Sequence, residues 1–382
     1  MSFLRTSSDC LNSLYTKALM LGGKIMYRKQ YDNLLNLHPD CQSLEHEADY
    51  IAKWKPLQRR PHKQSYRLFS QYMVDATNIV PEDICSGIIQ PLLNPIEYRP
   101  YYQDKNMFDL IIGRQHLPNT LLRCIRGGYY DAEYLPITSI EDKAESLLSS
   151  DGTLFLKPAV DRSSGVGVIA LFPTANGLAT SDGEPFNIDF INRYKSRHPD
   201  FIIQEGLSQH SSLARFNPTS INTIRIATYK SVKNDEVKIC GAILRIGKSG
   251  ENVDNAHAGG RFIGIGPDGN LNNYICDQYG NRYNDFNGID FSKSNYRLHD
   301  FQNIMEFAKM IGEKVFHHRL LALDIAVTED GTPKLIEFNV RAFSTWLFQF
   351  SGQPALGDNV AEIVDYCKDK LSTISKVHVE PF

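Results

Sequence analysis

The sequence lacks the surplus of charge of one sign that marks many nucleic-acid-binding proteins. Its 382 residues carry 41 Lys and Arg against 44 Asp and Glu, a formal net charge of -3 at pH 7. Proteins that bind nucleic acid usually present a net basic face to the phosphates. The balance therefore gives no reason to expect a nucleic-acid partner.

Cysteines are few, and long apolar runs are missing. The seven cysteines are scattered and none forms a CxxC pair, which argues against a zinc ribbon or a disulfide framework. No stretch approaches the run of about 20 apolar residues that crosses a membrane, and the first residues carry no apolar core of signal-peptide length. We therefore expect a cytoplasmic protein with reduced thiols and no transmembrane segment.

What the sequence does contain is a hairpin signal near its C-terminus. Residues 320–339 predict two strands joined by the Asp-Gly dipeptide at residues 330–331, which is typical of tight β-turns. Centring the hairpin on that dipeptide pairs Asp324 with Glu337 and Ala322 with Asn339. The other face then pairs Leu323 with Phe338 and Ile325 with Ile336.

This hairpin is a candidate metal site. Two carboxylates whose Cβ atoms lie about 5 Å apart repel each other unless a cation or a proton lies between them. An all-oxygen ligand set without His or Cys favours a hard cation such as Mg²⁺ over zinc. A solvated hairpin face is the alternative, but buried strands rarely place two acids this way without a use. We predict that Asp324, Glu337 and Asn339 hold Mg²⁺.

A second candidate site lies between residues 153 and 172. A predicted strand ends at Lys157, a loop rich in Ser and Gly follows, and another strand begins at residue 168. Backbone N–H groups of Ser163, Ser164 and Gly165 could surround phosphate oxygens, with Lys157 supplying a point charge. The loop does not end in Gly-Lys-Ser/Thr, so it is not a Walker motif. An ordinary hairpin loop is at least as compatible with the pattern.

Three more side chains, in a strand and in a loop, are candidates for contact with an anion. Arg225 lies in the middle of an alternating strand, and an unpaired buried guanidinium is too costly, so we expect it to be paired or to face a ligand. The glycine-containing loop at residues 255–265 carries His257 and Arg261, which are candidates for contact with an anion. A lone histidine is otherwise more often a hydrogen-bonded structural residue.

The first 75 residues are predicted to form a helical region with few glycines. An apolar helical pattern that includes Leu14 is expected to stop at Gly22-Gly23. A basic run between Lys53 and Arg67 is interleaved with aromatic residues. This run could dock on an anionic membrane or partner, but we favour a solvated helix face whose side-chain stems pack on the aromatics.

Together these pieces resemble the ATP-grasp superfamily. The family's order is a lysine in a preceding subdomain (Lys105), a second lysine before a Gly/Ser loop, a strand ending at the nucleotide edge (IIQEGL), and an Asp followed by Glu-x-Asn on a hairpin. NTIRIATY, NAHAGG and QEGLSQH resemble, more narrowly, the sugar-transfer-associated group found with bacterial surface polysaccharide synthesis. The resemblance covers about residues 80 to 365, and its motifs are specific only in combination.

The resemblance implies an α+β, ATP-grasp fold in which two β-rich lobes clasp ATP, with a helical N-terminal extension. The expected division is residues 1–75 for the helical region, 76–200 for the first lobe with the phosphate loop, and 201–382 for the second lobe with the metal hairpin. ATP phosphates would meet Lys105, Lys157, Ser163, Ser164 and Gly165, and Mg²⁺ would meet Asp324, Glu337 and Asn339. Adenine would meet Gln204, Glu205 and Leu207, and the ribose would meet His210. Arg225 would neutralise the γ-phosphate or an acylphosphate, and the acceptor would face Asn222, His257, Arg261 and Arg341.

The implied activity is ligation of a small-molecule carboxylate to an amine, through an acylphosphate, with ATP and Mg²⁺. The substrates would be an amino acid and a sugar acid or a second amino acid. The basic N-terminal region could dock on polysaccharide assembly machinery. A phosphotransferase acting on a hydroxyl, with His257 as a general base, is the first alternative. A non-catalytic nucleotide-binding protein is the second.

Overall fold

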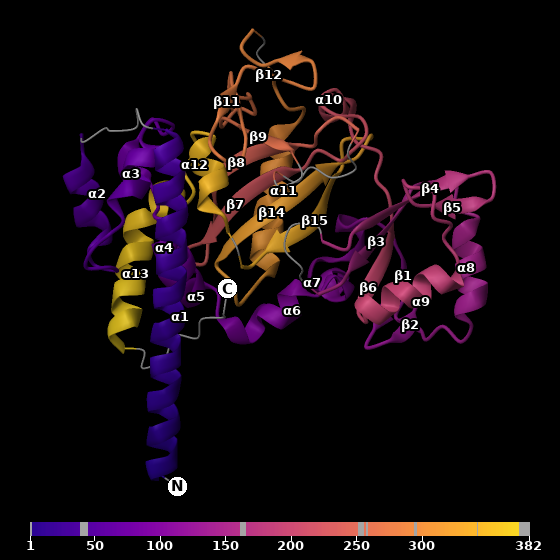
Figure 1. The fold of residues 1–382 in the computed structure, drawn as a ribbon, viewed down its shortest axis with the longest axis horizontal. Helices are drawn as coiled ribbons and strands as arrows, with labels where there is room; N and C mark the ends of the chain where they lie inside the picture. The colour runs from indigo at the N-terminus through magenta and orange to yellow at the C-terminus, as the bar shows by residue number, and fades with distance from the viewer. Residues whose placement is uncertain are drawn as a thin grey trace.

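The computed structural model describes residues 2–38, 45–160, 166–250, 256, 259–293, 296–341 and 343–373. Its two large β-sheets lie side by side, with a layer of helices from both ends of the chain on the far side of the larger sheet (Figure 1). Four predicted site residues lie outside the described residues: Ser163, Ser164, Gly165 and His257.

The smaller lobe is a six-stranded antiparallel sheet backed by two helices. Its strand order is β2-β1-β6-β3-β4-β5. The apolar sides of α8 (Ile140–Leu148) and α9 (Ile188–Arg197) pack on one face of the sheet. The strands are β1 (Thr120–Ile125), β2 (Gly128–Tyr130), β3 (Leu154–Pro158), β4 (Ile169–Thr174), β5 (Gly177–Ala179) and β6 (Phe201–Glu205). Because β6 pairs with β1 and β3, this lobe extends to Glu205 and does not end at residue 200.

The larger lobe is a seven-stranded antiparallel sheet with two covered faces. Its order is β11-β10-β9-β8-β7-β14-β15, and α11 (Phe301–Lys314) covers one face. Successive side chains of a strand point to opposite faces, so Ile224 and Ile226 pack on the α11 side while Arg225 and Ala227 face the other side, called here the front face. The strands are β7 (Ile224–Lys230), β8 (Val237–Ile246), β9 (Arg261–Gly264), β10 (Ile275–Cys276), β11 (Arg282–Tyr283), β14 (Leu320–Val327) and β15 (Pro333–Asn339), beside a small ribbon of β12 (Asp285–Phe286) and β13 (Ile289–Asp290).

The β14–β15 register confirms the predicted hairpin where the candidate ligands lie. Asp324 faces Glu337 and Ala322 faces Asn339. Beyond Asp324 the prediction is wrong, because a bulge shifts the register and Ile325 faces Leu335 instead of Ile336. The turn also spans residues 328–332, with the Thr328 N–H donating to the Thr332 carbonyl at 2.9 Å. A local pattern fixes neighbouring pairs but does not reveal an extra residue inserted between them.

The predicted helix stop at Gly22-Gly23 is wrong. A single helix, α1, runs through Ser2–Leu37 and includes both glycines. Each glycine costs about 1 kcal/mol relative to alanine in a helix, but the C-terminal half of α1 buries Tyr31 and Leu34 in the protein core. Packing therefore overrides the local preference.

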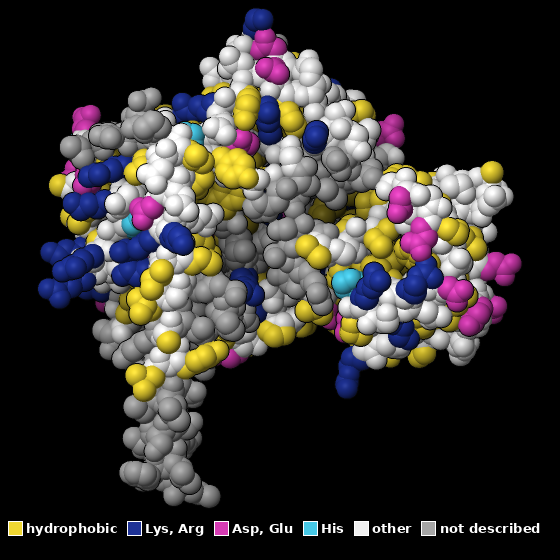
Figure 2. All heavy atoms as spheres, viewed as in Figure 1, with side chains coloured by type: hydrophobic (Ala, Val, Ile, Leu, Met, Phe, Trp, Pro, Cys, Tyr) yellow, Lys and Arg dark blue, Asp and Glu magenta, His cyan; other side chains and the backbone are white. Residues whose placement is uncertain are grey.

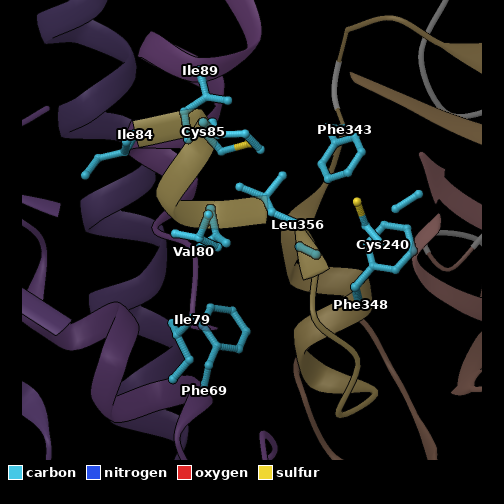
Figure 3. Close-up of a cluster of buried hydrophobic side chains, with 14 of the residues drawn as sticks. Phe69, Ile79, Val80, Ile84, Cys85, Ile89, Cys240, Phe343, Phe348 and Leu356 are labelled. Carbon is cyan, nitrogen blue, oxygen red and sulfur yellow. The ribbon is translucent and has the colours of Figure 1, made fainter. Parts of the chain in front are cut away.

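The N-terminal helices share one core with the C-terminal helices and the front face of the larger sheet. Figure 3 shows Phe69, Ile79 and Val80 on one side of this core, and Phe348 and Cys240 on the other. The remaining helices are α2 (Glu47–Trp54), α3 (Lys63–Phe69), α4 (Glu82–Ile84), α5 (Gln90–Leu93), α6 (Arg99–Gln103), α7 (Phe108–Ile112), α10 (Ser211–Ala214), α12 (Thr345–Phe350) and α13 (Val360–Thr373), with a π-turn at Cys85–Ile89 and short 3-10 turns at Ala76–Asn78, Ile96–Tyr98, Lys105–Met107, Arg114–His116 and Gly357–Asn359. None of the described helices is both long enough and apolar enough to cross a membrane.

Candidate active site

Asp324 is clamped by two arginines on the front face of the larger sheet. Arg225 Nε and Nη2 donate to its two carboxylate oxygens, each at 2.7 Å, and Arg245 Nη1 donates at 3.1 Å. The carboxylate is buried, with only 3% of the residue exposed. Burial alone would raise the pKa of Asp324, but the two guanidinium groups hold it below its usual value. The expectation that Arg225 is paired is confirmed.

Arg245 was missed by the sequence reasoning. It lies on β8, two residues beyond Ile243, which pairs with Arg225, so both arginine side chains leave the same face of the sheet. The signal was present, because a charged residue inside the apolar strand Val237–Ile246 needs a partner just as Arg225 does. The partner is the same carboxylate.

Glu337 connects the hairpin to the smaller lobe through Lys105. The Lys105 Nζ atom lies 2.9 Å from Glu337 Oε1, and the two side chains are 15% and 30% exposed. The backbone N–H of Lys105 donates to the Ala159 carbonyl, just after β3 (2.8 Å). Lys105 therefore lies where the two sheets approach each other, and the Glu337 carboxylate is more accessible than that of Asp324.

Lys157 lies at the end of β3, next to this pair. Its Nζ atom is 3.3 Å from the side-chain oxygen of Gln204 on β6. Its pKa is lowered to about 8, mainly because burial disfavours the ammonium form and also because Lys105 is close, while Glu337 opposes the shift. A cation whose hydrogen-bond partner is a neutral amide would be stabilised by an anion such as a phosphate.

The oxygens along the hairpin fit a hard cation. The Asn339 Nδ2 atom donates to the Ala322 carbonyl at 3.2 Å and approaches Asp324 at 3.4 Å, so its amide oxygen is the atom able to bind a metal. Within the described part of the chain, no three His, Cys, Asp or Glu side chains gather around one point. Two carboxylates and an amide are ligand types that Mg²⁺ takes together with water and phosphate oxygens. Both Asp324 oxygens accept from arginines in this structure, so Mg²⁺ binding at Asp324 stays a prediction.

The chain passes from the smaller sheet to the larger one at the end of β6. The Gln204 amide nitrogen lies 3.4 Å from the Pro118 carbonyl, and Asn119 Nδ2 donates to the Glu205 carboxylate at 2.8 Å. Leu207 follows and is partly exposed. Five side chains thus form a row where the two sheets meet: Lys157 with its partner Gln204, Lys105 with its partner Glu337, and Asp324 opposite Glu337 in the hairpin. The bonded partners Lys105 and Glu337 are 232 residues apart.

The sequence signature of the family described as "Sugar-transfer associated ATP-grasp" matches residues 89–365, which contain this whole row. The chain belongs to this ATP-grasp family. The predicted α+β fold, with two β-rich lobes and a helical N-terminal region, is confirmed.

Solved structures with the ATP-grasp fold resemble the chain at low identity. An N5-carboxyaminoimidazole ribonucleotide synthetase bound to ADP is 14% identical over 66% of this chain and 50% of its own, with a TM-score of 0.38. A D-alanyl-alanine synthetase A from Vibrio cholerae is 12% identical (72% and 66%, TM-score 0.39), and a biotin carboxylase from Campylobacter jejuni is 9% identical (72% and 48%, TM-score 0.40). The chain spans half to two thirds of the length of these proteins. No curated protein matches the sequence.

Two residues expected on the acceptor side of this ATP-grasp protein make other contacts. Asn222 is fully buried, and its Nδ2 atom donates to Gln209, Leu213 and Asn217, so it holds that loop together. Arg261 pairs with Ile246 in the register of β8 and β9, which puts it on the opposite face from Arg245. There its guanidinium stacks on Tyr283 (3.5 Å) and Phe286 (4.6 Å). No contact among the described residues connects Asn222 or Arg261 with the row, so their acceptor-side roles stay predictions.

The predicted contacts of His210 with the ribose and of Arg341 with the acceptor stay predictions. His210 caps α10 by accepting from the Ser212 N–H, and its ring stacks on His299 with centroids 4.9 Å apart. It also lines a hollow of about 580 Å³ at the start of α11, which contains none of the other predicted site residues. Arg341 follows β15, is partly exposed, and is close enough to Tyr27 of α1 to oppose the rise of that tyrosine's pKa.

Proposed function

We propose that the chain is an ATP- and Mg²⁺-dependent ligase that joins a carboxylate to an amine. The observation that carries this proposal is the row of charged side chains between the sheets, in which two carboxylates lie between two lysines and two arginines: Lys157, Lys105, Glu337, Asp324, Arg225 and Arg245. Such a row can hold a triphosphate and a substrate carboxylate while neutralising the charge that develops between them. The chemistry then needs no protein nucleophile.

The proposed role of each side chain follows from its position along the row. Lys157 and Lys105 bind phosphate oxygens at the smaller lobe, and Arg225 and Arg245 balance charge where the γ-phosphate meets the acceptor. Asp324, Glu337 and Asn339 would hold Mg²⁺, which would supply Lewis-acid stabilisation of the phosphates. The substrate carboxylate attacks the γ-phosphorus and releases ADP. The amine then attacks the acyl carbon, phosphate leaves, and the nitrogen loses its proton.

The substrates we propose are an amino acid and a sugar acid or second amino acid, used in surface polysaccharide synthesis. The family's description as sugar-transfer associated supports this class. Docking of the basic N-terminal region on polysaccharide assembly machinery stays a prediction, and no contact among the described residues supports it.

A product assay tests the reaction class. The protein is incubated with ATP, Mg²⁺ and a panel of amino acids and uronic acids while ADP, AMP, phosphate and product masses are followed. ADP, free phosphate and a product lighter than its two substrates by one water establish amide ligation. ADP with a phosphorylated product and no free phosphate establishes a kinase, and AMP with pyrophosphate contradicts the acylphosphate route.

Lys157→Met should weaken ADP binding by about 10- to 100-fold, because a charge-assisted contact to phosphate is worth roughly 1.5–3 kcal/mol. Isothermal titration calorimetry measures the affinity. Lys195→Met is the matched control, because Lys195 belongs to the same lobe but stacks on Tyr129, at 4.2 Å, and should leave the affinity within about twofold. Unchanged affinity in Lys157→Met would make the Gly/Ser loop an ordinary hairpin loop.

ADP affinity should fall as the pH rises above about 8. The pKa of Lys157 is about 8 in the free protein, and a bound phosphate raises it, so binding above pH 8 requires uptake of a proton. Affinity should therefore be insensitive to this group below pH 8 and fall up to about tenfold per pH unit above it. Titrations between pH 7 and about 9.5 measure the slope. The same slope in Lys157→Met would assign the pH dependence to another group.

A further inference from the structure

The N-terminal half of α1 carries an apolar face that no other described part of the chain covers. This half of the helix extends away from the body (Figure 1). Leu14, Leu21 and Ile25 are 56–59% exposed, and Ala18 between them is also exposed. Their spacing of four, three and four residues places them on one side of a helix. In the sequence, Leu11 and Leu4 precede them at matching spacing.

This face is not a continuation of the protein core. The C-terminal half of α1 buries Tyr31 and Leu34 against the other helices. Leu34 follows Ile25 by nine residues, and at about 100° per residue the two lie on opposite sides of the helix. The apolar side of α1 therefore changes from one face to the other near residue 26, and Leu14, Leu21 and Ile25 face away from the core of the described residues.

Basic side chains continue this face where the apolar residues end. Lys29 is exposed and lies one helical turn after Ile25. On the same side, Arg28 donates to the Arg60 carbonyl at 2.6 Å and Asp32 contacts His62 at 3.2 Å, which holds residues 60–62 along α1. The exposed Arg59 and Arg60 therefore lie beside the end of the apolar face. Figure 2 shows apolar side chains along the visible side of α1 and Lys and Arg side chains gathered next to it, over α2 and the segment that follows.

The basic residues of α1 favour an anionic lipid surface over a second copy of the chain as the partner of this face. Between residues 10 and 31 the sequence has four basic residues, Lys17, Lys24, Arg28 and Lys29, and no acidic one, and of these Arg28 also pairs with Asp83 at 3.0 Å. A second copy packed on this face would bring like charges together, which destabilises helix pairs. An apolar helix face bordered by Lys and Arg is complementary to an anionic lipid surface, where the helix lies in the plane of the headgroups.

We propose that the exposed face of α1, together with Arg59 and Arg60, docks this protein on an anionic membrane surface. This proposal does not depend on the ligase reaction. Part of the basic run remains the solvated helix face expected from the sequence, because Lys63 and Arg67 both pair with Glu47. Docking uses the apolar contact for affinity and the arginines for selection of anionic lipid.

Flotation of the full chain with lipid vesicles tests the proposal. The protein should float with vesicles of phosphatidylcholine and phosphatidylglycerol, not with phosphatidylcholine alone, and added salt should weaken the binding. Leu14→Asp/Leu21→Asp should reduce the bound fraction about tenfold or more, because it places charge in the apolar face. Arg59→Glu/Arg60→Glu should reduce binding and its salt dependence.

The matched control is Leu110→Asp/Leu135→Asp, which makes the same change at two leucines that are each 62% exposed elsewhere on the surface. It should bind within about twofold of the wild type, and both leucine pairs should leave the melting temperature of the body unchanged. Failure of the wild type to float with anionic vesicles, or equal flotation of Leu14→Asp/Leu21→Asp, overturns the proposal. A dimer in sedimentation analysis that Leu14→Asp/Leu21→Asp converts to a monomer overturns it in favour of a second copy.

Discussion

Glu337→Gln should lower turnover by about 10³-fold while the protein stays folded. The substitution removes the more accessible carboxylate of the proposed metal site and the partner of Lys105. The lost ion pair is partly exposed and contributes less than about 1 kcal/mol to stability. Turnover is followed as ADP release under the conditions identified by the product assay, and the melting temperature reports the fold.

The dependence of ADP binding on Mg²⁺ separates a metal ligand from a general charge effect. Without metal, loss of a carboxylate near the phosphates should leave ADP affinity equal or tighter, whereas the gain from added Mg²⁺ should disappear. Glu329→Gln is the matched control, because Glu329 is an exposed acid in the turn of the same hairpin and should change neither quantity. An active Glu337→Gln protein with a normal response to Mg²⁺ would contradict the metal assignment.

The sequence could predict those features of this site that depend on residues close together in the chain. Alternation and the Asp-Gly turn place Asp324 opposite Glu337, because neighbours in a hairpin are fixed by its two strands alone. The bulge after Asp324 adds one residue that no composition rule reveals, so the register beyond it was wrong. Gly22-Gly23 shows the same limit, because packing of Tyr31 and Leu34 stabilises a helix that the local pattern ends.

The partners of the charged residues depend on pairing between distant strands. The need for a partner of Arg225 follows from its strand position, but the choice of Asp324 follows from β7 lying between β8 and β14. That same pairing adds Arg245 and sends Arg261 to the other face. The contact of Lys105 with Glu337 spans 232 residues. The order of the motifs along the chain predicts that these residues belong to one site. The order of the strands in the sheet determines which of them are in contact.

Asp324→Asn should destabilise the protein by about 3 kcal/mol. The substitution leaves the buried Arg225 guanidinium and the partly buried Arg245 guanidinium without the carboxylate that both contact. Removal of one partner from a buried ion pair typically costs 3–5 kcal/mol. Urea unfolding measures the change. Asp365→Asn, the same substitution on an exposed position of α13, should stay within about 0.5 kcal/mol of the wild type.

Unfolding at low pH and a second substitution identify why Asp324→Asn loses stability. The pKa of Asp324 is held below its usual value, so its contribution to stability is present above the unfolded pKa of about 3.9 and disappears as the pH falls further. The gap between wild type and Asp324→Asn should therefore narrow as the pH is lowered towards 3. Arg245→Gln added to Asp324→Asn should cost less than the sum of the single changes, because it relieves repulsion between the arginines. Additive losses of unfolding free energy, and a difference between wild type and Asp324→Asn that does not change with pH, would show that Asp324 is not held as a charged partner of the two arginines.

Turnover is harder to interpret for Asp324→Asn than for Glu337→Gln. A loss of turnover in Asp324→Asn would combine a change at the proposed metal site with displacement of the arginines. Glu337→Gln removes a carboxylate to which only one lysine is bound in the described structure.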